Sequence, residues 1–260
     1  AGTRGDVVLG IGDDAALLAP PPGRQLVVTA DTLNDGVHFP RGTSPADVGW
    51  KALAVNLSDL ASMGAEPAWC TLSLSLPQSD PAWIEGFLDG FLDLAGQHGI
   101  ALVGGDTTRG PLSIAVTAMG LVEPGRALRR DGARVGDEVW VTGTLGDAAG
   151  GLALLDREPV SALRARLDRP TPRVAAGRAL AGIATACVDV SDGLLADLGH
   201  IASRSRVAAQ VEVDALPMSE TLRAAFDAAT RTALQASGGD DYELCFTAPL
   251  EARAGIDAVS

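Results

Sequence analysis

The arrangement of apolar and polar positions divides the chain into short strands and longer helices separated by glycine-rich turns. The segment "AWCTLSLSL", for example, has apolar residues at every second position, as in a half-buried strand. The first half reads as strands over residues 6–11, 25–31, 68–76 and 111–122 and helices over residues 45–64 and 81–99. Each of these helices is expected to end at a glycine, Gly64 or Gly99.

The second half repeats the alternation after a joint rich in Gly, Pro and Arg, "EPGRALRRDGARVGDE". The pattern there predicts strands over residues 138–143, 186–190, 208–213 and 242–249 and helices over residues 146–155, 172–182 and 192–205. Strands that alternate with such helices indicate an α/β protein. We place a domain boundary at the joint, giving domains of residues 1–124 and 125–260. Because the last predicted strand lies so near residue 260, we expect the second domain to be truncated and the native chain to continue.

Composition and charge limit the partners of the protein. Its 260 residues are 47% hydrophobic, which is enough for a substantial core. Lys and Arg number 20 against 33 Asp and Glu, and the net charge of −13 excludes nucleic acid and anionic membranes as partners. No run approaches the roughly 20 apolar residues of a membrane span, so we expect a cytoplasmic protein. Cys70, Cys187 and Cys245 fit neither a zinc spacing nor a disulfide framework and are expected to be buried free thiols.

Aspartates recur beside glycines and at predicted strand ends in both halves of the chain. The motifs are "GIGDDAAL", "VVTADTL", "NLSDLASMG", "LVGGDTTRG", "VDVSDGLLADLG" and "SGGDDYELC". An aspartate in such a place is most often a helix N-cap. Because the arrangement recurs at the loop ends where α/β folds bind their ligands, we favour a ligand site. Carboxylate oxygens and open backbone amides are the groups that Mg²⁺ and phosphate require.

Two of these motifs leave a choice between a structural role and ligand binding. Asp59 shares a predicted helix face with Asn56 beside an apolar stripe, so it is either a solvated rim residue or a ligand directed into a cleft. Asp189 ends a predicted strand and has no capping duty, whereas Ser191 and Asp192 can cap the following helix.

The motif "LVGGDTTRG" also combines an aspartate at a predicted strand end with neighbouring glycines. Gly104 and Gly105 leave the backbone open to a ligand, and Asp106 is expected to project from the strand end. Two carboxylates about 4 Å apart repel by roughly 4 kcal/mol at an effective dielectric constant of 20. A cleft that gathers several of them therefore favours divalent cations over shared protons.

Cationic residues are scarce near these motifs. Arg129 and Arg130 are adjacent and form either a solvated turn or a clamp on phosphate oxygens. His38 follows "TADTLNDG" closely and is either structural or directed into the same cleft. The sequence contains no Ser-His-Asp set, P-loop lysine motif or protein-kinase signature.

With these motifs the sequence resembles the thiamine-monophosphate kinase family, in the superfamily that includes aminoimidazole ribonucleotide synthetase. The matching segments run in order over nearly the whole chain: "GIGDDAALL", "ADTLNDGVHF", "DVGWKALAVNLSDLASMGAEPAW", "LVGGDTTRGPLS", "GDEVWVTGTLGDAAGGL", "RPTPRV", "DVSDGLLADLGHI" and "SGGDDYELCF". The resemblance implies a mixed α/β (α+β) fold of two domains, an N-terminal sheet that forms a barrel across a homodimer, and ATP bound between the domains. It also implies transfer of the γ-phosphoryl of ATP to thiamine monophosphate, giving thiamine diphosphate, with several Mg²⁺ ions between nucleotide and protein.

The resemblance also implies a role for individual residues. The implied metal ligands are Asp14, Thr29, Asp31, Asp59, Asp106, Asp189 and Asp192. The residues implied to contact ATP are Gly105, Asp106, Arg130 and Ser191, and those implied to face thiamine monophosphate are His38 and Asp240. We name no catalytic base, because the acceptor phosphate is already largely ionised at neutral pH and can attack in line. Asp13 is expected only to shape the turn beside Asp14.

Two positions depart from the family pattern. Ala30 stands where the family often has a hydroxyl residue, and "GGDD" replaces "GGED", so that Asp240 is one methylene shorter. Two other functions remain open. One is an ATP-dependent synthetase or phosphotransferase of the same superfamily that acts on another small molecule. The other is a non-catalytic protein that binds magnesium and nucleotide. Such a protein would lack the residues that bind the phosphoryl acceptor, so the presence of His38 and Asp240 is evidence against it.

Overall fold

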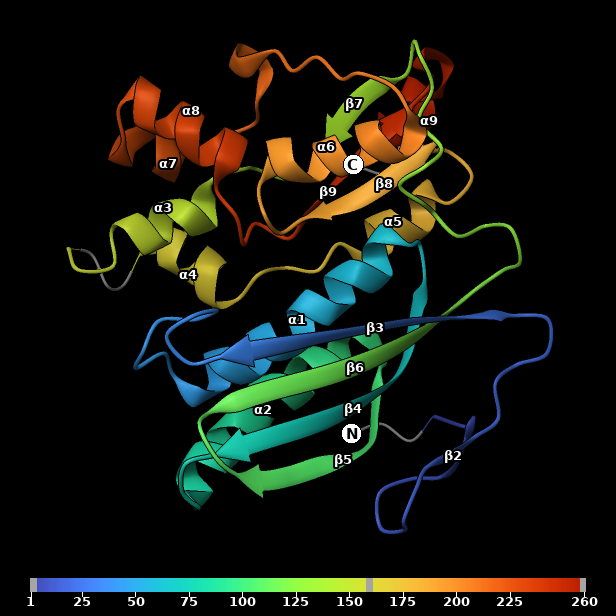
Figure 1. Cartoon of the computed structure of the whole chain (residues 1–260), viewed down its shortest axis with the longest axis vertical. Coiled ribbons are helices and arrows are strands. Elements are labelled where there is room, and N and C mark those ends of the chain that lie inside the picture. The colour runs from blue at the N-terminus through green and yellow to red at the C-terminus, as the bar shows by residue number, and fades with distance from the viewer. Residues whose placement is uncertain (1–3, 158–160, 258–260) are drawn as a thin grey trace. The chain divides into compact units, whose positions relative to one another are not determined.

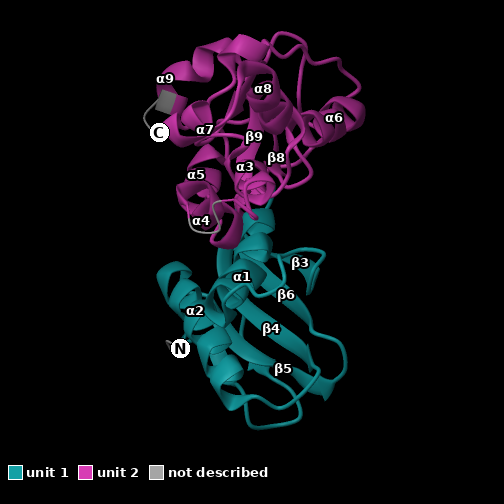
Figure 2. Ribbon diagram, turned by 90° about the vertical axis from the view of Figure 1, so that its left-hand side faces the viewer, with its two compact units in different colours: residues 1–60, 65–125 teal, residues 61–64, 126–260 magenta. Residues whose placement is uncertain are grey.

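The computed structural model, drawn with its labelled helices and strands in Figure 1, describes residues 4–157 and 161–257. The chain forms two compact units, coloured separately in Figure 2. Unit 1 comprises Ala1–Leu60 and Ala65–Gly125, and unit 2 comprises Ala61–Gly64 and Arg126–Ser260. In the described ranges, no helix is both long enough and apolar enough to span a membrane.

Unit 1 is a sheet with helices on one face. Its strands are β3 (Gln25–Asn34), β4 (Glu66–Leu76), β5 (Ala101–Arg109) and β6 (Ser113–Val122), in the order β3-β6-β4-β5. The β4–β5 pair is parallel, and the β3–β6 and β4–β6 pairs are antiparallel. Helices α1 (Pro45–Ser62) and α2 (Pro81–His98) cover one face of this sheet, as Figure 2 shows. The other face carries a short hairpin of β1 (Val7–Leu9) and β2 (Leu17–Leu18), which packs against Trp69 and Ala101.

Local chemistry sets the two long helices. Asp80 caps α2 by accepting the N–H of Trp83 at 3.2 Å, and Gly99 ends it in the left-handed conformation at φ 62°. A Cβ on Gly90 would lie 1.8 Å from the carbonyl oxygen of Ala46, so the two helix backbones touch at this glycine. Both helices therefore begin and end close to their predicted boundaries and lie against each other.

Unit 2 contains a smaller antiparallel sheet. It is formed by β7 (Glu138–Val141), β9 (Glu243–Ala248) and β8 (Ala186–Val190), in that order. The helices are α3 (Asp147–Ala153), α4 (Ala162–Asp168), α5 (Val174–Leu180), α6 (Leu194–Ser205), α7 (Glu220–Ala225), α8 (Ala228–Ser237) and α9 (Arg253–Asp257). Short 3-10 turns lie at Val213–Ala215 and Leu250–Ala252. The core joins Val188 and Val190 of β8 to Leu198 and Ile201 of α6. Cys70, Cys187 and Cys245 are buried free thiols, as predicted.

One predicted strand is absent, and two others extend further than predicted. Residues 208–213 do not form a strand, because among the described residues no neighbouring strand pairs with them to complete a ladder. The strand expected to end at Asp31 continues to Asn34, paired residue by residue with β6. The strand that precedes Asp106 likewise continues to Arg109 along β4, so Asp106 lies within a strand and not at its end.

Candidate functional site

Strand β3 and helix α1 bring three of the predicted ligands together: Thr29, Asp31 and Asp59. Thr29 and Asp31 lie two residues apart, so their side chains leave the same face of the sheet. Thr29 Oγ1 donates a hydrogen bond to Asp59 Oδ2 of α1, which shows that this is the face toward the helix. Burial, and then the negative charge of Asp59, raise the pKa of Asp31 above its ordinary value. A partly buried site thus holds two repelling carboxylates and a hydroxyl.

His38 lies near this group of residues. Its Nδ1 accepts the backbone N–H of Asn34 at 3.0 Å, which fixes the ring in the turn after β3. The imidazole is close enough to Asp31 for a protonated ring to oppose the increase in the pKa of that carboxyl. The side chain of His38 is exposed. It is therefore available to a ligand at the edge of the Thr29–Asp31–Asp59 group.

Ala30 belongs to the other face of β3. Because side chains alternate along a strand, the methyl group of Ala30 points away from the face that carries Thr29 and Asp31. A hydroxyl at this position would also point away. The departure of Ala30 from the family pattern therefore leaves only its backbone carbonyl to consider as a ligand.

Within one chain, Asp106 lies apart from the Thr29–Asp31–Asp59 group. In the sheet it aligns with Ser73, Ala115 and Thr32, a row that alternates with the row containing Asp31. Its side chain therefore leaves the face opposite α1 and α2. Moreover, β3 and β5 are the two edges of the sheet. The sequence grouped Asp31 and Asp106 as ligands, but a single sheet does not bring their carboxylates together.

Gly105 has a strict steric role in β5. A Cβ at this position would lie 1.8 Å from the carbonyl oxygen of Leu72, and the backbone φ is +149°. Neither condition suits a residue with a side chain. Gly104 beside it has open space around it and no such φ.

Asp13 and Asp14 lie in the exposed loop after β1. The N–H of Asp14 donates to Oδ1 of Asp13 at 2.8 Å, so the side chain of Asp13 is used in shaping the turn. The loop continues into Ala16 and Leu18, which pack against the cluster of Trp69 and its neighbours. Among the residues that the structure describes, no group of three or more His, Cys, Asp or Glu side chains is arranged to hold a metal ion.

In unit 2 the loop between β8 and α6 differs from its prediction. Asp189 is buried on β8. Ser191 and Asp192 do not cap α6: its N-cap is Gly193, which has no side chain to bond the helix. Instead, the N–H groups of Ser191 and Asp192 both donate to Oδ2 of Asp197, each at 3.0 Å. Burial raises the pKa of Asp197, and these two N–H groups oppose the increase.

The loop before β9 joins the β8–α6 loop. The N–H of Asp240 donates to the carbonyl oxygen of Ser191 at 2.9 Å, and the N–H of Tyr242 to that of Val190 at 2.8 Å. The hydroxyl of Tyr242 donates to Oδ1 of Asp240 at 3.0 Å. Asp240 and Tyr242 both have left-handed backbones, at φ 68° and 51°. Ser191 and Asp240, predicted to contact different substrates, are thus neighbours within unit 2.

Asp241 was missed by the sequence analysis. It is 2% exposed and accepts the N–H groups of Gly146 at 2.6 Å and Ala148 at 3.3 Å. It therefore caps α3 from a distant part of the chain. Burial raises the pKa of Asp241 to about 7, and the two backbone N–H groups act in the opposite direction.

Glu243 was also missed, and it has a structural role. It is completely buried and accepts hydrogen bonds from Arg173 Nε and Nη2, both at 2.6 Å. Arg166 Nη2 donates at 2.7 Å and the Thr142 hydroxyl at 2.6 Å. Because the carboxylate is fully used by these partners, it holds β9 to the segments before α5 and within α4. Sequence pattern alone gives no signal for such a distant set of partners.

The adjacent arginines differ from each other. Arg129 forms an ion pair with Asp131 at 2.6 Å on an exposed turn, which agrees with the structural alternative for this residue. The side chain of Arg130 is exposed, while its carbonyl oxygen accepts the hydroxyl of Ser205 at 3.0 Å. The backbone of Arg130 is therefore fixed, and its guanidinium is accessible to a ligand.

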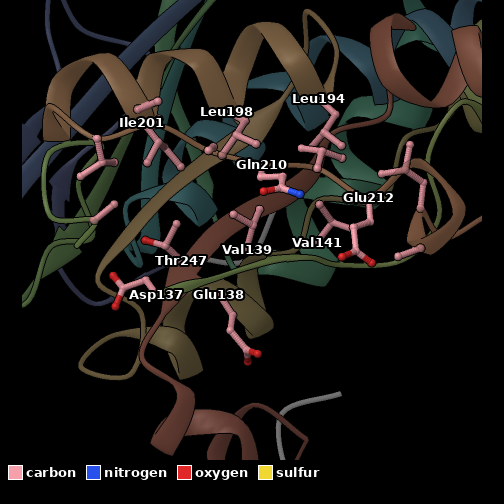
Figure 3. Close-up of a pocket in the computed structure, with 18 of the residues that line it drawn as sticks. Asp137, Glu138, Val139, Val141, Leu194, Leu198, Ile201, Gln210, Glu212 and Thr247 are labelled. Carbon is pink, nitrogen blue, oxygen red and sulfur yellow. The ribbon is translucent and has the colours of Figure 1, made fainter. Parts of the chain in front are cut away.

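A groove of about 660 Å³ lies elsewhere in unit 2 (Figure 3). Leu194, Leu198 and Ile201 of α6 line one side, and Val139 and Val141 of β7 lie across from them. The described residues that line this groove include none of the predicted site residues. Its lining mixes these aliphatic residues with charged residues of both signs, such as Glu212 and Arg134.

The two units correspond to one class of protein. Residues 12–122 match the family "AIR synthase related protein, N-terminal domain", and residues 134–249 match the corresponding C-terminal domain family. Crystal structures of the hydrogenase maturation protein HypE from Escherichia coli share the fold, with TM-scores of 0.77 at 21% identity. Both units therefore belong to the domain families of the AIR synthase related proteins.

More similar proteins identify the branch. The thiamine-monophosphate kinases of Salmonella typhimurium strain LT2 and Escherichia coli K12 are 50% and 48% identical to this chain, over 98% of it and 81% of each relative. The crystal structure of the Stenotrophomonas maltophilia K279a enzyme has a TM-score of 0.95 at 60% identity, covering 98% of this chain and 84% of that one. A structure of AaThiL complexed with AMPPCP and TMP has a TM-score of 0.84 at 38% identity, covering 93% and 81%. The chain belongs to the thiamine-monophosphate kinase family.

Proposed function

We propose that this kinase transfers the γ-phosphoryl group of ATP to thiamine monophosphate, giving thiamine diphosphate and ADP in the cytoplasm. The observation that carries the proposal is the similarity to AaThiL, whose structure was obtained with AMPPCP and TMP. AMPPCP resembles ATP but cannot give up its γ-phosphoryl group, and TMP fits the acceptor. The presence of both His38 and Asp240, the two residues expected on the acceptor side, favours a kinase over a magnesium–nucleotide binder.

Mg²⁺ fits the donors that unit 1 presents. Thr29, Asp31 and Asp59 offer only hard oxygen atoms, and burial with a neighbouring carboxylate raises the pKa of Asp31. A divalent cation would remove that repulsion. When bound, Mg²⁺ supplies charge neutralisation and orientation of the phosphate groups.

The remaining residues bind and orient the substrates. The further carboxylates that we propose for metal binding are Asp14, Asp106, Asp189 and Asp192. The residues that we propose to contact ATP are Gly105, Asp106, Arg130 and Ser191. His38 and Asp240 orient the acceptor phosphate, and Asp240 is already held in place by the Tyr242 hydroxyl. Because that phosphate is ionised at neutral pH, in-line transfer needs no general base from the protein.

We further propose that two copies of unit 1 pair through the face opposite α1 and α2. On this face β3 exposes Leu26 by 50% and Val28 by 56%, and removing this apolar surface from water would stabilise a pair of sheets. Asp106 lies on the same face. Pairing of the sheets into a barrel across a homodimer would bury these apolar residues and enclose Asp106 between the two copies.

The test is a direct assay. Incubation with ATP, Mg²⁺ and thiamine monophosphate should give thiamine diphosphate, separated by chromatography. Release of ADP that does not depend on thiamine monophosphate, without any thiamine diphosphate, would refute the proposed function. Asp31→Asn and Asp106→Asn should each lower turnover at least about a hundredfold, whereas Asp93→Asn on the exposed surface of α2 should not. Equal turnover in Asp31→Asn and the wild type would refute its metal role.

A further inference from the structure

The loop between β8 and α6 is held by a residue outside it. Asp197 lies in the first turn of α6 and is 3% exposed. Its Oδ2 atom accepts the N–H groups of both Ser191 and Asp192, each at 3.0 Å. Because one oxygen atom receives both groups, the two peptide planes are directed to a single point. This arrangement fixes the directions in which the side chains of Ser191 and Asp192 leave the backbone.

The same anchor extends to the loop before β9. The carbonyl oxygen of Ser191 accepts the N–H of Asp240 at 2.9 Å. A Cβ on Gly239 would lie 2.5 Å from that oxygen, so the two loops touch and glycine is needed for the contact. The place of Ser191 therefore determines the place of Asp240.

We propose that Asp197 is a positioning residue that aligns the nucleotide-side loop, Ser191 and Asp192, with the acceptor-side residue Asp240. It touches neither substrate and acts through the backbone N–H groups that it accepts. The proposal rests on the proposed function for the identity of the two ligands. It does not need the negative charge of Asp197, because a neutral oxygen acceptor in the same place would hold both N–H groups.

Three substitutions separate positioning from simple stabilisation. Asp197→Asn keeps an oxygen acceptor in the same place. Asp197→Ala removes it, and Asp197→Glu keeps the charge but moves the oxygen atoms by one methylene. The matched control is Asp147→Ala: Asp147 is also 3% exposed in unit 2, but its partners are the hydroxyls of Thr144 at 2.7 Å and Ser219 at 2.6 Å.

The first measurement is amide hydrogen exchange in the protein without ligands. Asp197→Ala and Asp197→Glu should speed exchange at residues 191 and 192 by at least about tenfold, and Asp197→Asn should stay within about threefold of the wild type. Asp147→Ala should lower the melting temperature without this change. Wild-type exchange in a folded Asp197→Ala or Asp197→Glu protein would overturn the proposal, as would the same acceleration in Asp147→Ala. Asp197→Glu decides the question if Asp197→Ala does not fold.

The second measurement is steady-state kinetics with ATP, Mg²⁺ and thiamine monophosphate. Asp197→Ala and Asp197→Glu should raise KM for both substrates by about tenfold and lower kcat as well, with rescue in Asp197→Asn. Unchanged constants in these two variants would overturn the proposal. A wild type that forms no thiamine diphosphate, yet shows the expected exchange pattern, would refute the proposed function and leave the anchoring role of Asp197 intact.

Discussion

The carboxyl group of Asp241 should make unit 2 less stable as the pH rises. Its pKa is about 7 in the folded protein, against an ordinary value of 3.8, because burial disfavours the charged form. The folded state therefore holds a proton that the unfolded state has lost between these two pH values. The free energy of unfolding falls by about 1.4 kcal/mol for each pH unit well inside that range, or about 2 kcal/mol from pH 5 to pH 7, and levels off above about pH 8.

Asp241→Asn isolates this contribution. The amide is neutral at every pH and its oxygen can still accept the N–H of Gly146, so capping of α3 is largely kept. We expect the unfolding free energy of the variant, minus that of the wild type, to increase by about 2 kcal/mol between pH 5 and pH 7. Urea unfolding followed by circular dichroism at several pH values measures this difference. If the difference stays constant to within about 0.5 kcal/mol, the carboxyl is not protonated in the folded protein and the reasoning is wrong.

The remaining predictions concern unit 1 and the metal. Gly105→Ala should prevent correct formation of β5 and abolish activity, because its Cβ would meet the carbonyl oxygen of Leu72 at 1.8 Å, whereas Gly104→Ala should fold normally; circular dichroism and the kinase assay compare them. Asp14→Asn should reduce kcat far more than Asp13→Asn, whose acid helps to shape the turn by accepting an N–H at 2.8 Å, and equal losses would contradict a metal role for Asp14. AMPPCP at about 100 times its Kd should raise the melting temperature by several degrees with Mg²⁺ present and hardly at all after EDTA, as measured by thermal shift.

The sequence predicted the parts of the fold that depend on local signals. Helices α1 and α2 have clear periodicity in the sequence, and α2 also has Asp80 as its N-cap and Gly99 at its end. Their predicted bounds therefore agree with the structure within a few residues. The strand expected over residues 208–213 failed, although its alternation is clear. Alternation describes two faces of a segment but does not supply the neighbouring strand that a ladder needs.

In the candidate site, too, the sequence predicted what depends on local pattern and missed what depends on distant partners. That Thr29 and Asp31 share a face follows from strand periodicity, and the hydrogen bond to Asp59 agrees with their grouping. Asp106 could not be placed, because its face depends on a register shift between β4 and β5 that no local pattern records. Asp197 and Asp241 were missed since their partners are backbone N–H groups, and for Asp241 these lie 95 and 93 residues away.

The left-handed backbone of Asp240 has a consequence for how the protein can change. A side chain in this conformation costs roughly 1 kcal/mol that glycine would not, so Asp240→Gly would relax the backbone while deleting the carboxylate. Against that gain stands the lost hydrogen bond from the Tyr242 hydroxyl, so the backbone and the carboxylate have opposite effects on stability at this position. If Asp240 contacts the acceptor as proposed, the chain keeps a strained backbone there for the sake of its carboxylate, and attempts to make the enzyme more heat-resistant should leave this residue alone.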